Sequence, residues 1–137
     1  MTKEFPALDF GPLPAERVNA VLGTELEEGP VHMSGLAHRH AARDHPDDYA
    51  DYFRHVATVI ADPTFIGQAP KHRENFEMIR RIPGGDGRAL LIAVGVEMDE
   101  QGRYRVKSVY SITSAELERK RAKGTVKLAP QTTTPPP

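Results

Sequence analysis

Three closely spaced histidines are the residues of this sequence best suited to acid–base chemistry. His38, His40 and His45 fall within eight positions, and Arg39 and Arg43 lie between them. An imidazole changes its charge near neutral pH, and a guanidinium binds phosphate oxygens. The segment therefore holds the types of group that cleavage of a phosphodiester requires.

Two other interpretations of this histidine cluster stay open. Metal-binding histidines on one helix are usually three or four residues apart, whereas these are two, five and seven apart, which disfavours a zinc site. A structural role at the end of a helix, with ordinary hydrogen bonds, is the second alternative. His55 is expected to be structural or at the surface, and His32 has no assigned role.

The composition limits the class of protein. A chain of 137 residues with 39% hydrophobic and 27% charged residues is expected to form one domain. The absence of cysteine excludes disulfides, thiolate metal sites and a cysteine nucleophile. No stretch has the roughly 18 apolar residues of a membrane span, and no secretory signal opens the sequence, so we expect a cytoplasmic protein without a membrane partner.

Charge is distributed unevenly along the chain. Residues 1–37 carry two basic and six acidic side chains, a net charge of −4. Residues 71–127 carry thirteen basic and eight acidic side chains, a net charge of +5. A partner that bears phosphate is expected to bind the second half.

Hydrophobic periodicity and capping residues predict helices first and strands afterwards. The predicted helices cover 15–22, 35–44 with Ser34 as its N-cap, 46–61 beginning at Pro46, and 115–122. Three antiparallel strands are expected at 74–82, 88–98 and 104–113, and a fourth at 64–68. Within the middle strand, residues 89–96 (ALLIAVGV) are apolar on both faces, as in a central strand covered on both sides.

These elements predict an α+β fold in which N-terminal helices pack on one face of a four-stranded antiparallel sheet, followed by a short C-terminal helix. The other face of the sheet is then free to form a site. We divide the chain into an entry arm with a short helix at 1–30, the main domain at 31–128, and a disordered tail rich in Thr and Pro at 129–137.

Several short motifs carry a resemblance to a known family over residues 31–128. They are His40-x4-His45-Pro46, 61–67 (ADPTFIG), Pro70-Lys71, 76–82 (FEMIRRI), 90–94 (LLIAV), 106–112 (VKSVYSI) and Lys123-Gly124. In this order they resemble the phage-associated nuclease domains grouped with barnase, EndoU, the tRNase colicins and RelE as the BECR fold. The resemblance implies a metal-independent ribonuclease, often a toxin or effector domain of phage or secretion-linked origin, and a BECR-like sheet.

In such nucleases the ribose 2′-hydroxyl attacks the neighbouring phosphate. The resemblance implies that His40, or else His45 and thirdly His38, is the acid or base. It also implies that Lys71 is a cation at the phosphate, and that Ser108 and Tyr110 position the phosphate or share the proton transfer. The residues expected to bind substrate are His38, Arg39, Arg43, Arg80, Arg81, Lys107 and Ser111. No metal and no small-molecule cofactor is expected.

The strand period conflicts with this assignment. With a strict period of two, Ser108 and Tyr110 share the apolar face of the last strand, whereas Ser111 and Thr113 share the polar face. From the pattern alone we would choose Ser111 and Thr113, and from the resemblance Ser108 and Tyr110. Either the site faces the helices or a bulge shifts the register.

The expected partners are RNA, such as tRNA, and an inhibitor or immunity protein, because a free ribonuclease would damage its host. A non-catalytic RNA- or protein-binding module of a phage-related protein is the main alternative. A zinc hydrolase built on the histidines is a third hypothesis, which predicts that EDTA abolishes activity.

Overall fold

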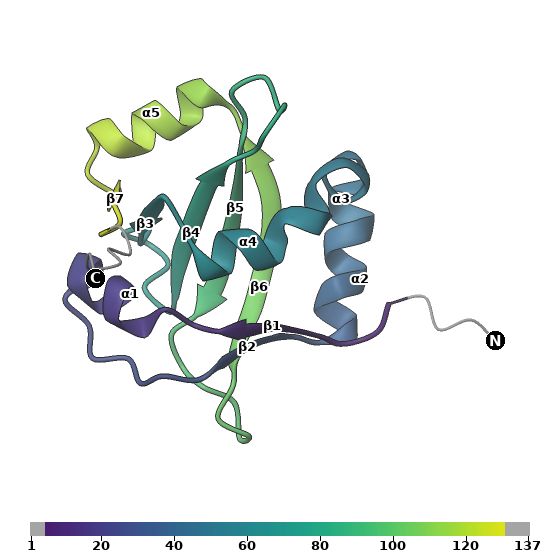
Figure 1. Ribbon diagram of the computed structural model, residues 1–137, viewed down its shortest axis with the longest axis vertical. Coiled ribbons are helices and arrows are strands. Elements are labelled where there is room, and N and C mark those ends of the chain that lie inside the picture. The colour runs from purple at the N-terminus through teal and green to yellow at the C-terminus, as the bar shows by residue number, and fades with distance from the viewer. Residues whose placement is uncertain (1–4, 131–137) are drawn as a thin grey trace, which may run out of the picture.

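Seven strands form one sheet in the computed structural model, which describes residues 5–130. The strands are β1 (Leu8–Pro12), β2 (Pro30–Met33), β3 (Phe65–Gly67), β4 (Asn75–Arg81), β5 (Ala89–Gly95), β6 (Tyr104–Ile112) and β7 (Val126–Leu128). Their spatial order is β1-β2-β6-β5-β4-β3-β7 (Figure 1). Strands β2 and β6 are parallel, and the other neighbouring pairs are antiparallel.

The predicted α+β class is confirmed, whereas the predicted four-stranded antiparallel sheet is wrong. The meander β4-β5-β6 and the adjoining β3 lie where the sequence predicts them. The three additional strands have only three to five residues each, and two of them contain proline. Such short strands have too few residues for a period of two to be recognised, and their pairing depends on distant segments.

The segment expected to be an entry arm contributes β1 and the helix α1 (Ala15–Leu22). Leu13 and Val18 are buried in the main core. At the other end Ala129 is buried, and its backbone N–H donates to the Thr64 carbonyl oxygen. The rest of the predicted tail, 131–137, lies outside the described residues.

The helices after α1 are α2 (Gly35–Asp44), α3 (Pro46–Tyr52), α4 (Val56–Ala61) and α5 (Ser114–Ala122). The Ser34 side chain caps α2 by accepting from the Ala37 N–H at 3.1 Å, as predicted. The single helix predicted over 46–61 is wrong, because a 3-10 turn at Phe53–His55 divides it. The division lets α3 pack against α2 while α4 crosses the sheet (Figure 1).

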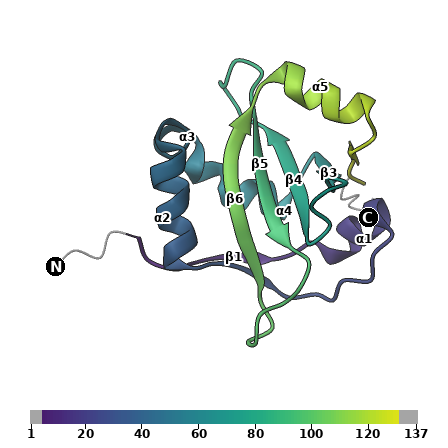
Figure 2. The same ribbon diagram turned by 180° about the vertical axis from the view of Figure 1, so that it is seen from behind.

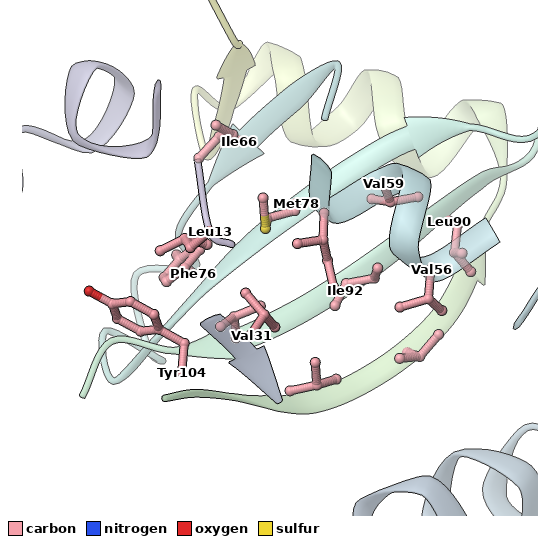
Figure 3. Close-up of a cluster of buried hydrophobic side chains, with 14 of the residues drawn as sticks. Leu13, Val31, Val56, Val59, Ile66, Phe76, Met78, Leu90, Ile92 and Tyr104 are labelled. Atoms are coloured by element: carbon pink, nitrogen blue, oxygen red, sulfur yellow. The ribbon is translucent and has the colours of Figure 1, made fainter. Parts of the chain in front are cut away.

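The two faces of the sheet carry separate apolar clusters. On one face α1 and α4 cover the larger cluster, in which Val56 and Val59 of α4 lie over Ile92 (Figure 3). On the other face Leu117 of α5 packs with Leu91. The central strand β5 is thus covered on both faces, as its continuous apolar run predicts.

Helix α5 covers only one end of its face (Figure 2). The remainder of that face, which we call the open face, presents the polar side chains described below. Within the described residues no helix is both long and apolar enough to span a bilayer.

Candidate active site

A β-bulge in β6 decides which side chains reach the open face. Strand β5 pairs Ala93 with Ser108 but Val94 with Val106, so Lys107 is an extra residue in β6. Val106 before the bulge and Val109 after it both lie in the core on the helix-covered face. The bulge therefore turns Ser108 and Tyr110 to the open face. The sequence left two possibilities, a site that faces the helices or a bulge that shifts the register, and the bulge is the correct one.

Ser108 and Tyr110 line a pocket of about 230 Å³, which we call the Ser108 pocket. Its lining residues are Ala69, His72, Asn75, Glu77, Ala93, Ser108 and Tyr110. The pocket thus combines a carboxylate, two hydroxyls, an amide and an imidazole. These groups can accept and donate protons and hydrogen bonds around one phosphate.

Glu77 is the carboxylate of this pocket. Its side chain is only 12% exposed, and its Oε1 lies 3.3 Å from the Lys120 Nζ of α5. The Glu77 carboxylate thus forms a largely buried ion pair beside the Ser108 pocket. Its neighbour Asn75 has a buried Oδ1 without a hydrogen-bond partner in the described structure. A buried amide oxygen normally accepts a hydrogen bond, so a donor on a ligand would satisfy it.

Tyr110 is half-buried beside the Glu77 carboxylate. Burial raises the pKa of the Tyr110 phenol, and the negative charges of Glu77 and Glu116 raise it further. The hydroxyl therefore stays protonated to high pH and can donate a hydrogen bond.

His45 stacks on the ring of Tyr110, with 5.5 Å between ring centroids and an interplanar angle of 28°. It occupies the junction of α2 and α3, because Pro46 disfavours helical geometry at the preceding residue and begins α3 itself. The exposed imidazole thus lies against Tyr110, which is one of the residues that line the Ser108 pocket.

A carboxylate of α3 ties this junction to the sheet. The Asp48 Oδ2 accepts from the Ser111 backbone N–H at 2.8 Å, and its Oδ1 accepts from the Ser111 hydroxyl at 2.7 Å. The Arg88 Nε donates to the same hydroxyl oxygen at 2.9 Å. We call Asp48, Ser111 and Arg88 the Asp48 clamp, and it joins α3 to β6 at the residue next to Tyr110.

His40 lies in a different concavity of about 390 Å³, which we call the cationic cleft. Its lining residues are His32, Ser34, Leu36, Ala37, His40, Asp99, Arg103, Arg105, Val106 and Lys107. Helix α2 runs beside β6 (Figure 2). His40 of α2 and His45, the C-cap residue of α2, thus lie beside the same strand, β6. His40 lines the cleft with Val106 and Lys107, and His45 stacks on Tyr110.

Three of the sequence candidates lie away from both concavities and have structural contacts. His38 is 5% exposed, its ring nitrogens lie 2.9 Å from the Pro6 carbonyl oxygen and 2.7 Å from the Tyr49 hydroxyl, and its ring stacks on Phe53. Ser111 is buried on the helix-covered face in the Asp48 clamp.

Arg80 also points to the helix-covered face, where its Nη1 donates to the Asp62 Oδ2 at 2.9 Å. Thr113, the other residue that the pattern favoured, caps α5 by accepting from the Glu116 N–H.

The remaining candidates are exposed. Arg81 is paired with Glu118 at 3.4 Å, beside α5. Arg39 and Arg43 lie on the solvent side of α2, and Lys71 lies in the loop before β4, next to His72. Of these, only Lys71 adjoins a residue that lines the Ser108 pocket.

Sequence reasoning missed Glu77, Asn75, His72 and Arg105. Glu77 did leave a signal, because it is a charged residue between the buried Phe76 and Met78 of a strand. A charged side chain at that position must point to the face opposite its neighbours.

Asp62 gives Arg80 a structural role that can be tested by pH. The hydrogen bond from Arg17, and then that from Arg80, lower the pKa of the Asp62 carboxyl below its usual value. Its stabilising contribution is therefore complete above the unfolded-state pKa, near pH 4, and is lost as the pH falls through the lower folded-state pKa. We expect the unfolding free energy of Asp62→Asn, measured by urea denaturation between pH 5 and 2, to depend less on pH than that of the wild type. An unchanged slope would contradict this role.

Within residues 5–130, no three His, Asp or Glu side chains converge in a way that could hold a metal ion. The family model described as phage-Barnase-EndoU-ColicinE5/D-RelE like nuclease 3 matches residues 10–119. The chain belongs to this nuclease family. No curated protein and no solved structure matches this nuclease. The matched range includes both concavities of the open face.

Proposed function

We propose that this nuclease is an endoribonuclease that uses the ribose 2′-hydroxyl as nucleophile and its own side chains as acid and base. The observation that carries the proposal is the Ser108 pocket, which Glu77, Ser108 and Tyr110 line and where the ring of His45 stacks on Tyr110. Attack by a neighbouring 2′-hydroxyl on a phosphodiester needs a proton acceptor, a proton donor and hydrogen-bond donors to the phosphate, and these side chains are of those types.

The proposed reaction begins when the Glu77 carboxylate accepts the proton of the 2′-hydroxyl. The 2′-oxygen attacks phosphorus and forms a phosphorane, and the bond from phosphorus to the 5′-oxygen then breaks. Protonated His45 gives its proton to that leaving oxygen. The products are a 2′,3′-cyclic phosphate and a free 5′-hydroxyl.

The hydroxyls of Ser108 and Tyr110 act on the phosphate in this scheme. Each donates a hydrogen bond to a non-bridging oxygen, whose negative charge grows in the transition state. The raised pKa of Tyr110 supports a donor role, because the phenol keeps its proton. His40 is the alternative acid or base, and Lys71 is a cation that the loop before β4 would bring to the substrate.

We further propose that the substrate is tRNA or another structured RNA, and that the nuclease acts as a toxin or effector domain in a cytoplasm. An inhibitor protein is then expected, because unrestrained cleavage would harm the cell that makes it. Residues 1–37 are acidic and the second half of the chain is basic. This distribution fits a protein that binds RNA mainly through its second half.

The test is cleavage of total tRNA by the purified protein in EDTA. We expect fragments that end in 2′,3′-cyclic phosphate and that are lost in His45→Ala. His55→Ala is the matched control, since His55 lies beside Arg80 and Ile82, away from the open face. Circular dichroism checks that each variant is folded.

Other outcomes of this test decide between the alternatives. Loss of fragments in His40→Ala but not in His45→Ala would move the acid to the cationic cleft. Intact RNA with salt-sensitive binding would indicate a binding module, and activity only without EDTA would indicate a metal-dependent enzyme.

A further inference from the structure

The cationic cleft carries positive charge that the fold does not use. In the described structure the side chains of His40, Arg105 and Lys107 make no hydrogen bond and no ion pair, and all three are exposed. The Lys107 side chain lies across β5, so that a Cβ at Gly95 would come within 3.0 Å of its Cε. Unpaired cations held beside one another favour a ligand with negative charge.

The other charged groups of the cleft are already paired. Arg103 Nε donates to Asp99 Oδ2 at 2.9 Å, and His32 Nδ1 lies 2.8 Å from Asp9 Oδ1. The remaining charge therefore comes from Arg105 and Lys107, together with His40 when it is protonated.

One wall of the cleft is apolar. Leu36 is 63% exposed at its edge, and Ala37 and Val106 line the cleft beside it. A planar base can pack against such a wall while its phosphate meets the cations. The volume of about 390 Å³ lies within the range of small-molecule sites. The cleft thus suits a nucleotide better than an inorganic ion.

The cleft is continuous with the Ser108 pocket. A shallow hollow of about 180 Å³ lies between them, and Arg105 and Lys107 line both the hollow and the cleft. Asn75, with its unpartnered Oδ1, lines both the hollow and the Ser108 pocket. Glu74 and Glu97 also line the hollow. An RNA chain with one phosphate in the Ser108 pocket could thus continue past Arg105 and Lys107 into the cationic cleft.

We propose that the cationic cleft binds a nucleotide that flanks the scissile phosphate, so that the substrate is a single-stranded stretch of RNA several nucleotides long. The inference rests on the proposed function, because it takes the ligand to be the RNA that the Ser108 pocket cleaves. The stretch must be unpaired, since a base stacked inside a duplex cannot reach the wall formed by Leu36.

The experiment measures binding without cleavage. A fluorescein-labelled 2′-O-methyl oligoribonucleotide of about eight nucleotides cannot supply the attacking hydroxyl, and its length covers both concavities. Fluorescence anisotropy in EDTA compares the wild type with Arg105→Gln/Lys107→Gln. The control is Lys123→Gln/Lys127→Gln, which removes the same charge at the end of α5 and in β7, at the far edge of the sheet.

We expect the Arg105→Gln/Lys107→Gln variant to raise Kd for the octamer about tenfold and to lower the salt slope by roughly two, because the variant neutralises two fewer phosphates. The control is expected to change Kd less than about twofold. A labelled 2′-O-methyl dinucleotide should bind weakly and similarly to all three proteins, because it does not reach the cleft. Leu36→Ser should weaken binding of the octamer without changing the salt slope.

Equal effects of the two double variants on the octamer would overturn the inference, as would equal binding of a duplex and a single strand. Displacement of the octamer by an acidic peptide at lower concentration than by unlabelled RNA would assign the cleft to a protein partner instead. Cleavage of unmodified RNA is followed in parallel. Cleft-dependent binding without cleavage would overturn only the proposed function, and cleavage without cleft dependence would overturn only this inference.

Discussion

Glu77→Gln is expected to lower kcat for RNA cleavage by about 10²- to 10⁴-fold, with little change in KM. Glutamine has nearly the same shape as glutamate, and its amide oxygen can still accept a hydrogen bond from the substrate. It cannot take a proton from the 2′-hydroxyl. The measurement is single-turnover cleavage of a defined oligoribonucleotide in EDTA.

The matched control is Lys120→Gln, which breaks the same ion pair from the other side. If loss of the Glu77–Lys120 ion pair caused the lower kcat of Glu77→Gln, then Glu77→Gln and Lys120→Gln would lose activity equally. We expect the lysine variant to retain most of its activity, because the carboxylate remains. Glu118→Gln, which removes a carboxylate from the exposed pairs of α5, should have no effect. Full activity in Glu77→Gln would remove this residue from the mechanism.

Asp48→Ala is expected to lower the unfolding free energy by about 1–3 kcal/mol and to reduce kcat more than it changes KM. The Ser111 N–H and hydroxyl would lose their acceptor in a position that is 8% exposed. The start of α3 would also lose its attachment to β6, so that His45 would no longer be held over Tyr110. Urea denaturation and steady-state kinetics measure the two effects separately.

Asp47→Ala is the control for this variant. Asp47 lies in the same first turn of α3 and offers the same charge to the helix N-terminus, but it makes no contact with Ser111. A helix-dipole effect alone would appear in both variants. Unchanged kcat in fully folded Asp48→Ala would show that the clamp stabilises the domain without positioning His45.

The pair of concavities gives the histidines of α2 distinct expected roles. His45 stacks on Tyr110, which lines the pocket that contains Glu77, whereas His40 lines the cleft with Arg105 and Lys107, whose side chains form no ion pair within residues 5–130. In the proposed scheme the first histidine handles a proton and the second contacts the flanking RNA. Cleavage of a dinucleotide by the two alanine variants distinguishes these roles, because only His45 is needed for a substrate that ends at the pocket.

The sequence alone determined the local elements with strong patterns. The cap at Ser34, the helix start at Pro46 and the three strands of the meander each follow from neighbouring residues, and the structure has them where expected. The apolar run of β5 likewise implied burial on both faces. Such signals are readable because backbone period, capping and turn geometry depend on residues only a few positions apart.

The sequence also predicted candidate residues of suitable types, but it did not show which of them lie together. Ser108, Tyr110 and His45 line or adjoin one pocket, while His38, Arg80 and Ser111 turn to the opposite side or into the core. Histidines two positions apart on a helix face different directions. Spacing alone does not say which of the two is buried, so it could not show that His38 is buried and His40 exposed.

Tertiary structure alone decided which face of β6 presents Ser108 and Tyr110. One inserted residue at Lys107 reverses the orientation of the side chains that follow it in β6, relative to a regular strand, and a bulge has no reliable mark in its own residues. The same holds for the strands β1, β2 and β7 and for the placing of Glu77 beside Tyr110. Each depends on pairing between segments that are distant in the chain. Such pairing stabilises these segments only in the folded sheet, so their own residues carry no signal of it.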